Sequence, residues 1–457
     1  MPKLSLTIPL LLIALLAYTA PQAVAQDAPK LRGISACNAA LDLLEDGKPG
    51  EALKVMQDAK GTMDAEDEWL WWGNTGHCHR DLRQDAEALE HYGQALKLKP
   101  DCWFRIYYCR LLHEAGRWGE ALEELNQKID FDYQERADRL KSVINGPFKQ
   151  RWPLTWGKLE TTSKKGNYQI VSDVGVSVEE MDKLEQEAGK LDLESKSDQK
   201  KLEKLLKPND DLISLANLAE LARDEYMRFT GLKEKDMPEG KVFKVFFFMN
   251  EDDFHQYALE CGGDGDTENT LGFYEPNMKY LQLYSQPGAK SKVCGLALET
   301  VDTFFHEGWH QFFDMLTEQT PIWVDEGLAE FLGHAEVKSK GAKIELGLLI
   351  RVRGDTYTRY ERIRETIAQV EYVPFNKFFR FTSSDWNDGD VNIHYAQAWS
   401  IAYFALKGKD DNFRKDYSKM FWELMKGRHV DEVVDEIFTD EKLDQYQAAW
   451  LKYWKTT

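Results

Sequence analysis

The chain has 457 residues and a formal charge of −20, and 43% of its residues are hydrophobic. Its 14 Trp, 19 Tyr and 23 Phe exclude a largely disordered protein, and its length is enough for two or three domains that each bury a core. The 78 acidic residues outnumber the 58 basic residues. This balance argues against a nucleic-acid-binding protein and against docking on an anionic membrane, because both need a basic face.

The first 25 residues have the pattern of a secretory signal peptide. Lys3 supplies a positive charge, residues 4–18 form an apolar stretch, and Ala23-Val24-Ala25 fits a cleavage site of small residues. The apolar stretch is short for a membrane span, and no later stretch approaches about 18 uninterrupted apolar residues. We therefore predict a secreted or periplasmic protein with no membrane span in its mature chain. An uncleaved N-terminal anchor is the alternative.

Export would permit disulfide bonds between the six cysteines, and the sequence cannot choose among the many possible pairings. We favour a Cys261–Cys294 bond because both residues lie in one segment ahead of the motif described below. Free, buried thiols are the alternative. The six cysteines are Cys37, Cys78, Cys102, Cys109, Cys261 and Cys294.

Residues 33–135 are predicted to form three helical repeats of the tetratricopeptide type. A short Gly/Ala-Glu-Ala-Leu pattern recurs at spacings close to the repeat period of roughly 34 residues. Its recurring alanines are Ala52, Ala88 and Ala121. In the middle repeat, Gly76 would let two antiparallel helices approach, Tyr92 would fill the groove between them, and Pro100 would end the second helix. Such repeats offer a concave face to a peptide or protein partner. An unrelated helical bundle is the alternative.

The remaining chain mixes strands and helices, which predicts an α+β protein. A linker is expected over residues 136–165, followed by a second domain over 166–457. Its expected strands are 168–172, a buried strand at 241–248, and a pair at 271–274 and 280–284. Its expected helices cover 178–231, with a solvated charged stretch at 194–211, and then 251–259, 395–407, 413–426 and 440–454. The last three would form a helical C-terminal lobe.

The strongest chemical signal is the HExxH motif His306-Glu307-Gly308-Trp309-His310. Residues four apart share one face of a helix, so both imidazoles can reach one metal ion. Glu307 would then lie beside the metal, where it can take a proton from water. The apolar residues that would bury this helix are Phe304, Phe305, Trp309, Phe312, Phe313 and Leu316.

Glu326 is the predicted third ligand, within the run Trp-Val-Asp-Glu-Gly-Leu-Ala-Glu-Phe of a second helix. Two histidines and one carboxylate leave the fourth position of a zinc ion open to water, which is the catalytic arrangement. Glu330 follows one turn later and could accept a hydrogen bond from a liganding histidine, or be a plain surface carboxylate. Asp325 is expected to be solvated rather than a ligand.

This HExxH helix, followed by W-x-x-E-G-x-A-E, resembles the gluzincin metallopeptidases. It is most similar to the uncharacterised thermolysin-like families of bacterial exported proteins, specifically over residues 296–335 and more weakly over 240–457. The resemblance implies a zincin-like domain with a small mixed sheet, an active-site helix and a helical C-terminal lobe. It implies Zn²⁺ bound by His306, His310 and Glu326, with Glu307 as general base and Glu330 supporting a histidine.

Gluzincins commonly use a later Tyr or His to stabilise the oxyanion. Tyr395 is the first candidate and His394 the second, and a core role for Tyr395 is the alternative. The family's substrate-pairing strand would be Tyr280–Tyr284. The three other histidines considered have no partner spacing and are expected to be structural: His255, His334 and His429.

The sequence thus predicts an exported zinc peptidase, with repeats that recruit a substrate or a protein partner. Its alternative belongs to another class, a noncatalytic binding protein whose repeats carry the function. In that protein the zinc site would be structural or vestigial. The near-complete middle repeat and the absence of a readable specificity pocket motivate this alternative.

Overall fold

The computed structural model describes residues 31–45, 47–238, 240–261, 270–285, 292–293, 296–317, 320–338, 343–351 and 358–457. The predicted signal peptide and Cys294 lie outside these residues, so the cleavage site and the Cys261–Cys294 bond stay predictions. The other five cysteines, Cys261 among them, are buried free thiols. Among the described helices, none has the length and apolar character that a bilayer span requires.

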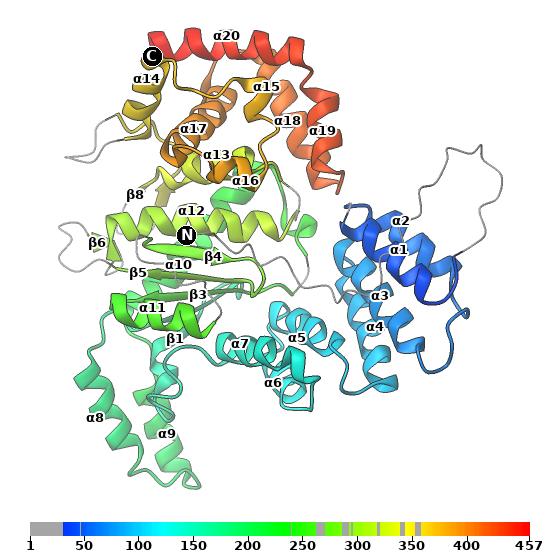
Figure 1. The fold of residues 1–457 in the computed structure, drawn as a ribbon. Coiled ribbons are helices and arrows are strands. Elements are labelled where there is room, and N and C mark those ends of the chain that lie inside the picture. The colour runs from blue at the N-terminus through cyan, green and yellow to red at the C-terminus, as the bar shows by residue number, and fades with distance from the viewer. Residues whose placement is uncertain are drawn as a thin grey trace.

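The N-terminal region consists of helices packed in antiparallel pairs (Figure 1). The pairs are α1 (Ile34–Glu45) with α2 (Pro49–Asp58), α3 (Glu68–Asp81) with α4 (Asp85–Leu98), and α5 (Phe104–Glu114) with α6 (Trp118–Leu125); α7 (Gln134–Asn145) follows. The three repeat alanines, Ala52, Ala88 and Ala121, are completely buried. A side chain on Gly76 would meet the Tyr92 ring at 2.7 Å, so the glycine permits this close approach. The prediction of a helical, repeat-like N-terminal region is confirmed.

A small mixed sheet forms the centre of the molecule, in the order β1-β2-β3-β5-β4. Its strands are β1 (Glu160–Thr162), β2 (Tyr168–Ser172), β3 (Phe243–Phe248), β4 (Gly272–Glu275) and β5 (Tyr280–Tyr284). Strands β2, β3 and β5 run parallel, whereas β1 and β4 are antiparallel edge strands. The prediction that Tyr280–Tyr284 is the substrate-pairing edge is wrong, because β5 pairs with β3 on one side and β4 on the other. The free edge beside the motif helix is β4.

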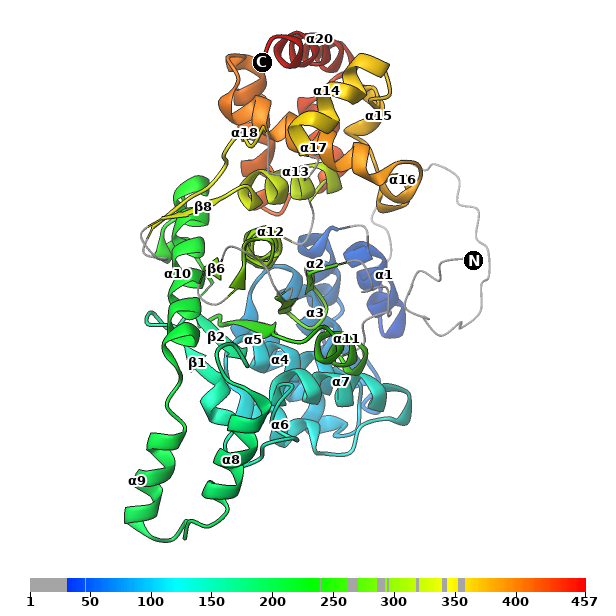
Figure 2. The ribbon, with the colours of Figure 1, turned by 90° about the vertical axis from the view of Figure 1, so that its left-hand side faces the viewer.

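Both faces of the sheet are buried, which explains the unbroken apolar run of β3. Val245 and Phe247 face a core shared with α10 (Asp210–Thr230) and α12 (Leu298–Asp314), while Phe246 and Phe248 face the opposite core. Helices α7 and α11 (Glu251–Glu260) cover that opposite face (Figure 2). The charged hairpin of α8 (Val178–Ala188) and α9 (Lys196–Leu205) extends away from the sheet, and α9 buries no residue.

The segment predicted as a linker, residues 136–165, contains most of α7 and all of β1. Val143, Phe148 and Trp152 from this segment pack into the core beneath the sheet. Two lysines of the sheet region also reach back to the helices that precede the sheet, one to the repeats and one to α7. Lys241 Nζ lies 2.6 Å from a carboxylate oxygen of Glu114, and Lys244 Nζ donates to the Ile144 carbonyl at 2.7 Å. The repeats therefore pack directly against the second domain.

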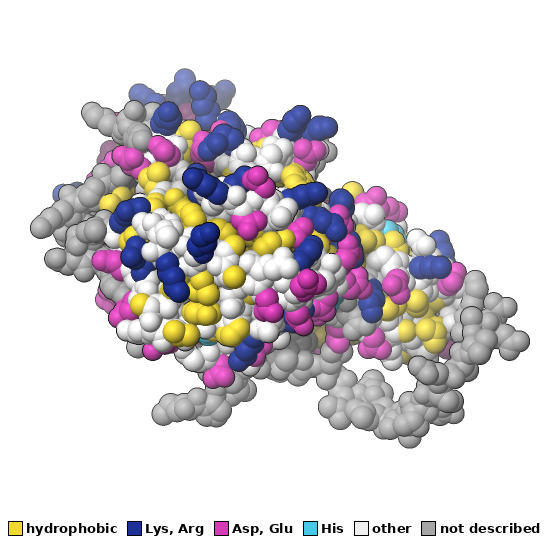
Figure 3. Space-filling view, turned by 90° about the horizontal axis from the view of Figure 1, so that it is seen from above, with side chains coloured by type: hydrophobic (Ala, Val, Ile, Leu, Met, Phe, Trp, Pro, Cys, Tyr) yellow, Lys and Arg dark blue, Asp and Glu magenta, His cyan; other side chains and the backbone are white. Residues whose placement is uncertain are grey.

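Helices make up the C-terminal lobe. They are α13 (Ile322–Gly333), α14 (Arg359–Gln369), α15 (Phe375–Phe378), α16 (Ser383–Asn387), α17 (Val391–Lys407), α18 (Asp411–Met425), α19 (Val430–Ile437) and α20 (Asp440–Thr456). Two short hairpins complete the described strands, β6 (Lys292–Val293) with β7 (Leu296–Ala297), and β8 (Glu336–Lys338) with β9 (Lys343–Glu345). Seen from above, acidic and basic side chains are interspersed around small apolar areas (Figure 3). The α+β prediction is confirmed.

Candidate metal centre

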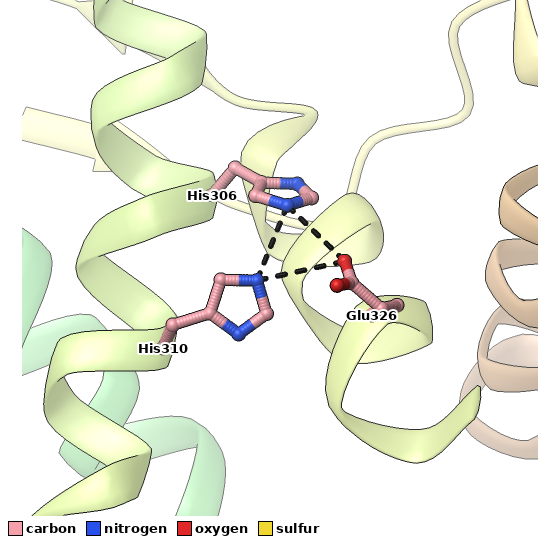
Figure 4. Close-up of side chains that lie close together, drawn as sticks. All are labelled: His306, His310 and Glu326. Carbon is pink, nitrogen blue, oxygen red and sulfur yellow. Dashed lines mark hydrogen bonds and ion pairs between the residues drawn. The ribbon is translucent and has the colours of Figure 1, made fainter. Parts of the chain in front are cut away.

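Helices α12 and α13 bring the three predicted ligands together (Figure 4). His306 and His310 project from successive turns of α12, and Glu326 faces them from α13. The two histidine Nε2 atoms are 3.3 Å apart, and Glu326 Oε2 lies 3.4 Å from His306 Nε2 and 3.5 Å from His310 Nε2. One atom from each residue therefore points at a common centre.

The spacing of these donor atoms fits a tetrahedral metal ion. Nitrogen and oxygen ligands bind zinc at about 2.0–2.2 Å, which puts two ligands of one tetrahedron about 3.4 Å apart. The three separations in the centre all agree with this value. In addition, Glu326 Oε2 is buried and accepts no hydrogen bond of normal geometry within the described residues. Two imidazole nitrogens and one carboxylate oxygen are ligands that zinc prefers, so the donor set could hold a divalent cation.

A second row of carboxylates contacts the far nitrogens of the two histidines. Asp325 Oδ2 lies 3.0 Å from His310 Nδ1, and Glu330 Oε1 lies 3.7 Å from His306 Nδ1. Arg359 binds both oxygens of Glu330, at 2.8 and 2.7 Å. Such contacts orient a liganding imidazole and select its tautomer. The expectation that Asp325 is merely solvated is therefore wrong, although one third of its side chain is exposed.

Burial and the packed carboxylates shift the pKa values of the centre in opposite directions. Burial disfavours imidazolium, but Asp325 and Glu326 raise the pKa of His310 well above its ordinary value. Burial likewise opposes charge on Glu326, yet the two histidines lower the pKa of its carboxyl group. The pKa of Glu330 falls to about 2, chiefly because Arg359 outweighs its burial. Without a metal, protons on the histidines balance the carboxylates, and a bound cation would take their place.

Glu307 points at the same centre without joining the three donor atoms. Its Oε1 is 4.0 Å from His306 Nε2, and its Oε2 accepts a hydrogen bond of 2.9 Å from the backbone N–H of Tyr274 in β4. Burial raises the pKa of the Glu307 carboxyl group above its ordinary value. One oxygen is thus held by the sheet edge while the other faces the centre, as a general base requires.

Of the two later candidates, Tyr395 lies beside the centre and His394 does not. The Tyr395 ring is 6.5 Å from the His306 ring and 5.2 Å from the Arg359 guanidinium. His394 is buried among aromatic rings, and its Nδ1 lies 2.8 Å from the Trp386 carbonyl oxygen. Burial raises the pKa of Tyr395, so its hydroxyl stays protonated and able to donate.

Close helix packing holds α12 and α13, which carry the three candidate ligands, in a fixed relative position. On α12, Phe304, Phe305 and Trp309 are buried as the apolar pattern predicted. On α13, a side chain at Gly327 would meet the Ala398 carbonyl oxygen of α17 at 2.6 Å, so only glycine allows these backbones to touch. Glu326 is the residue before Gly327, so this backbone contact fixes where Glu326 lies.

Residues 300–421 match a family model described as "Protein of unknown function (DUF1570)". The match runs from the start of α12 into α18 and includes both histidines, Glu307, Glu326 and Tyr395. No curated protein sequence matches the chain.

Proposed function

We propose that this protein is a zinc-dependent peptidase that uses Glu307 as its general base. One observation carries the proposal: three donor atoms converge at the separations of a tetrahedral zinc site, and a fourth carboxylate, Glu307, faces the same point. Two histidines and one glutamate leave a coordination position for water, whereas a purely structural zinc site would be closed by a fourth protein ligand. The likeness to gluzincins supports the same assignment.

His306, His310 and Glu326 would hold the metal, and the proton transfers fall to the residues around it. Bound zinc would supply a water with its pKa lowered to about 7 and would polarise the scissile carbonyl. Glu307 takes the water proton on Oε1 while the Tyr274 amide holds Oε2. It then passes this proton to the leaving amine. Hydrolysis thus needs no further acid.

Two further elements could contact an extended peptide at the centre. The Tyr395 hydroxyl, kept protonated by burial, would donate to the oxygen that gains negative charge at the former carbonyl. Strand β4 is a free edge beside α12, so it replaces β5 as the strand that would pair with substrate. Export and recruitment of a protein partner by the repeats belong to the same proposal.

The decisive test combines metal content with hydrolysis of fluorescently labelled casein. We expect about one zinc per chain and measurable hydrolysis in the wild type. Glu307→Gln should keep the zinc and lower kcat by about 10²–10⁴-fold, because the base is lost and the ligands remain. Glu326→Ala should lose both zinc and activity.

Glu299→Gln is the matched control, because Glu299 is an exposed residue on the same helix as Glu307. It should behave as wild type. A Glu307→Gln enzyme as active as the wild type would overturn the assignment of the base. Failure to take up zinc on reconstitution would overturn the metal site and leave the noncatalytic binding protein as the better hypothesis.

A further inference from the structure

Asp314, the last residue of α12, is the meeting point of three distant parts of the chain. Its carboxylate accepts a hydrogen bond of 2.7 Å from the Tyr274 hydroxyl on β4, and it also pairs with Lys279 Nζ from the turn before β5. Its backbone carbonyl accepts a hydrogen bond of 2.8 Å from Arg83 Nη2, which lies 231 residues earlier in the repeats. The negative end of the helix dipole also stabilises a cation placed at this carbonyl.

Both cationic partners of Asp314 have strained backbones. Arg83 has φ 60° and Lys279 has φ 54°, and Val370 is the only other described residue besides glycine with positive φ. This conformation is unfavourable for residues with a Cβ, so it persists only where the surrounding structure holds the backbone in place. Two of three such residues thus send their side chains to one aspartate.

Arg83 occupies a position at which the other two repeats have glycine. The corner between the two helices of each repeat lies five residues before the recurring alanine, and the three corner residues are Gly47, Arg83 and Gly116. All three have positive φ, 68°, 60° and 68°. The first and third repeats use glycine there, which suits this conformation. Only the middle repeat uses a long side chain, and that side chain reaches the end of α12.

The same cluster is joined to Glu307. Glu307 and Asp314 are two turns apart and share one face of α12, about 10 Å from each other along its axis. Tyr274 bridges them, because its backbone N–H donates to Glu307 and its hydroxyl donates to Asp314. The end of α12 and the edge strand are therefore locked to each other around the base.

Further charged side chains surround the cluster. Arg83, Lys279 and Asp314 line a small cavity of ≈ 30 Å³ together with Glu114 and Lys241. The last two form an ion pair of 2.6 Å between the repeats and the sheet. The buried Glu114 carboxyl group has its pKa lowered mainly by Lys241, which outweighs burial. This second contact fixes the repeats beside the cluster.

We propose that the repeats position the catalytic base, through the contact of Arg83 with Asp314 and the bridge that Tyr274 makes to Glu307. Arg83 and Lys279 are positioning residues, because neither touches the metal ligands. The proposal rests on the peptidase function above and adds a regulation of that site. Any partner that pulls the corner of the middle repeat away from α12 would slow the enzyme without removing its metal.

Arg83→Gly is the sharpest test, because it restores the residue that the other two repeats use and relieves the backbone. We expect a folded protein with wild-type zinc content and KM, and a kcat about tenfold lower, since the base loses part of its alignment. Hydrogen exchange at the Tyr274 amide should accelerate about threefold or more. Lys279→Gly should act in the same direction, and Arg83→Lys should retain more activity than Arg83→Gly.

Val370→Gly is the matched control. It replaces the third non-glycine residue of positive φ by glycine. Val370 is 72% exposed and lies at the C-terminal end of α14. It should leave kcat and Tyr274 exchange unchanged. If Arg83→Gly and Lys279→Gly behave like this control, the proposal is wrong. A loss of kcat that follows a loss of zinc would also overturn it.

The two proposals can fail separately. If the wild type hydrolyses no casein, the peptidase function fails, and the Tyr274 exchange rates alone decide whether the repeats hold the strand beside Glu307. If the wild type is active and both exchange and kcat are insensitive to Arg83→Gly, the peptidase function stands and the positioning role falls.

Discussion

Glycines allow helices to approach each other both in the repeats and at the candidate metal centre, but they do so in different ways. In the repeats, Gly76 of α3 faces the ring of Tyr92 on α4. In the metal centre, Gly327 of α13 faces the backbone carbonyl of Ala398 on α17. The first contact is made by a side chain and the second by main chain.

This difference indicates how much each region can adjust. A ring can turn or shift, so a repeat can repack around a changed neighbour at moderate cost. A backbone contact cannot be relieved without moving a whole helix. Because α13 carries Glu326 and α17 carries Tyr395, the contact between Gly327 and Ala398 sets the distance between the proposed metal ligand and the proposed oxyanion donor. A metal site tolerates only about 0.5 Å of such movement.

Gly327→Ala should therefore have the largest effect. The new methyl would lie 2.6 Å from the Ala398 oxygen, so α13 must move away from α17. We expect a loss of about 3 kcal/mol of stability, loss of most of the zinc, and hydrolysis reduced by about 10²-fold. Thermal unfolding and elemental analysis would measure this. Gly119→Ala on α6 is the control, since nothing lies within 4 Å of that position. Normal zinc content in Gly327→Ala would refute the argument.

Gly76→Ala should have an intermediate effect confined to the repeats. The methyl would meet the Tyr92 ring at 2.7 Å and disturb its hydroxyl, which lies 2.7 Å from His77 Nδ1. We expect about 1–3 kcal/mol of destabilisation, measured by urea unfolding, with unchanged zinc content because the centre is in another core. Zinc loss in this variant would mean that the packing of Gly76 against Tyr92 also supports the metal-binding core.

The sequence predicted what local periodicity controls. The i and i+4 histidines, the apolar face of α12 and the strand at 168–172 all appear where expected, since each depends only on neighbouring residues. The identity of the edge strand could not be predicted in this way. The β4–β5 hairpin could present either strand outward, and only the long-range parallel pairing of β5 with β3 places β4 at the edge.

Two arginines that contact the site helices or their side chains, Arg359 and Arg83, differ in whether the sequence indicates their contacts. Arg359 reaches Glu330 from a different helix, 29 residues later, and no sequence pattern links the two. The unusual position of Arg83, by contrast, can be recognised in the sequence. Once the recurring alanines set the register of the repeats, the series Gly47, Arg83 and Gly116 shows one non-glycine residue where a left-handed backbone is required.

Lys244→Met should have the smallest effect at neutral pH and the most informative pH dependence. Burial lowers the pKa of Lys244 from 10.5 to about 7, and its Nζ donates to the Ile144 carbonyl. Between pH 7 and about 10 the unfolded chain therefore keeps a proton that the folded protein has lost, so stability should rise with pH in this window. Lys244→Met should remove that rise while changing stability at pH 7 by only about 1 kcal/mol, because a lost hydrogen bond offsets relief of the buried amine.

Urea unfolding at pH 7 and pH 9 would measure the slope. Lys241→Met is the control, because the carboxylates of Glu114 and Asp85 raise the pKa of Lys241 despite its burial. Lys241 thus stays protonated in both states across this window, and its removal should lower stability without flattening the slope. If Lys244→Met keeps the wild-type slope, the amine is charged in the folded protein. The contact between α7 and β3 would then be a charged helix-end interaction rather than a neutral hydrogen bond.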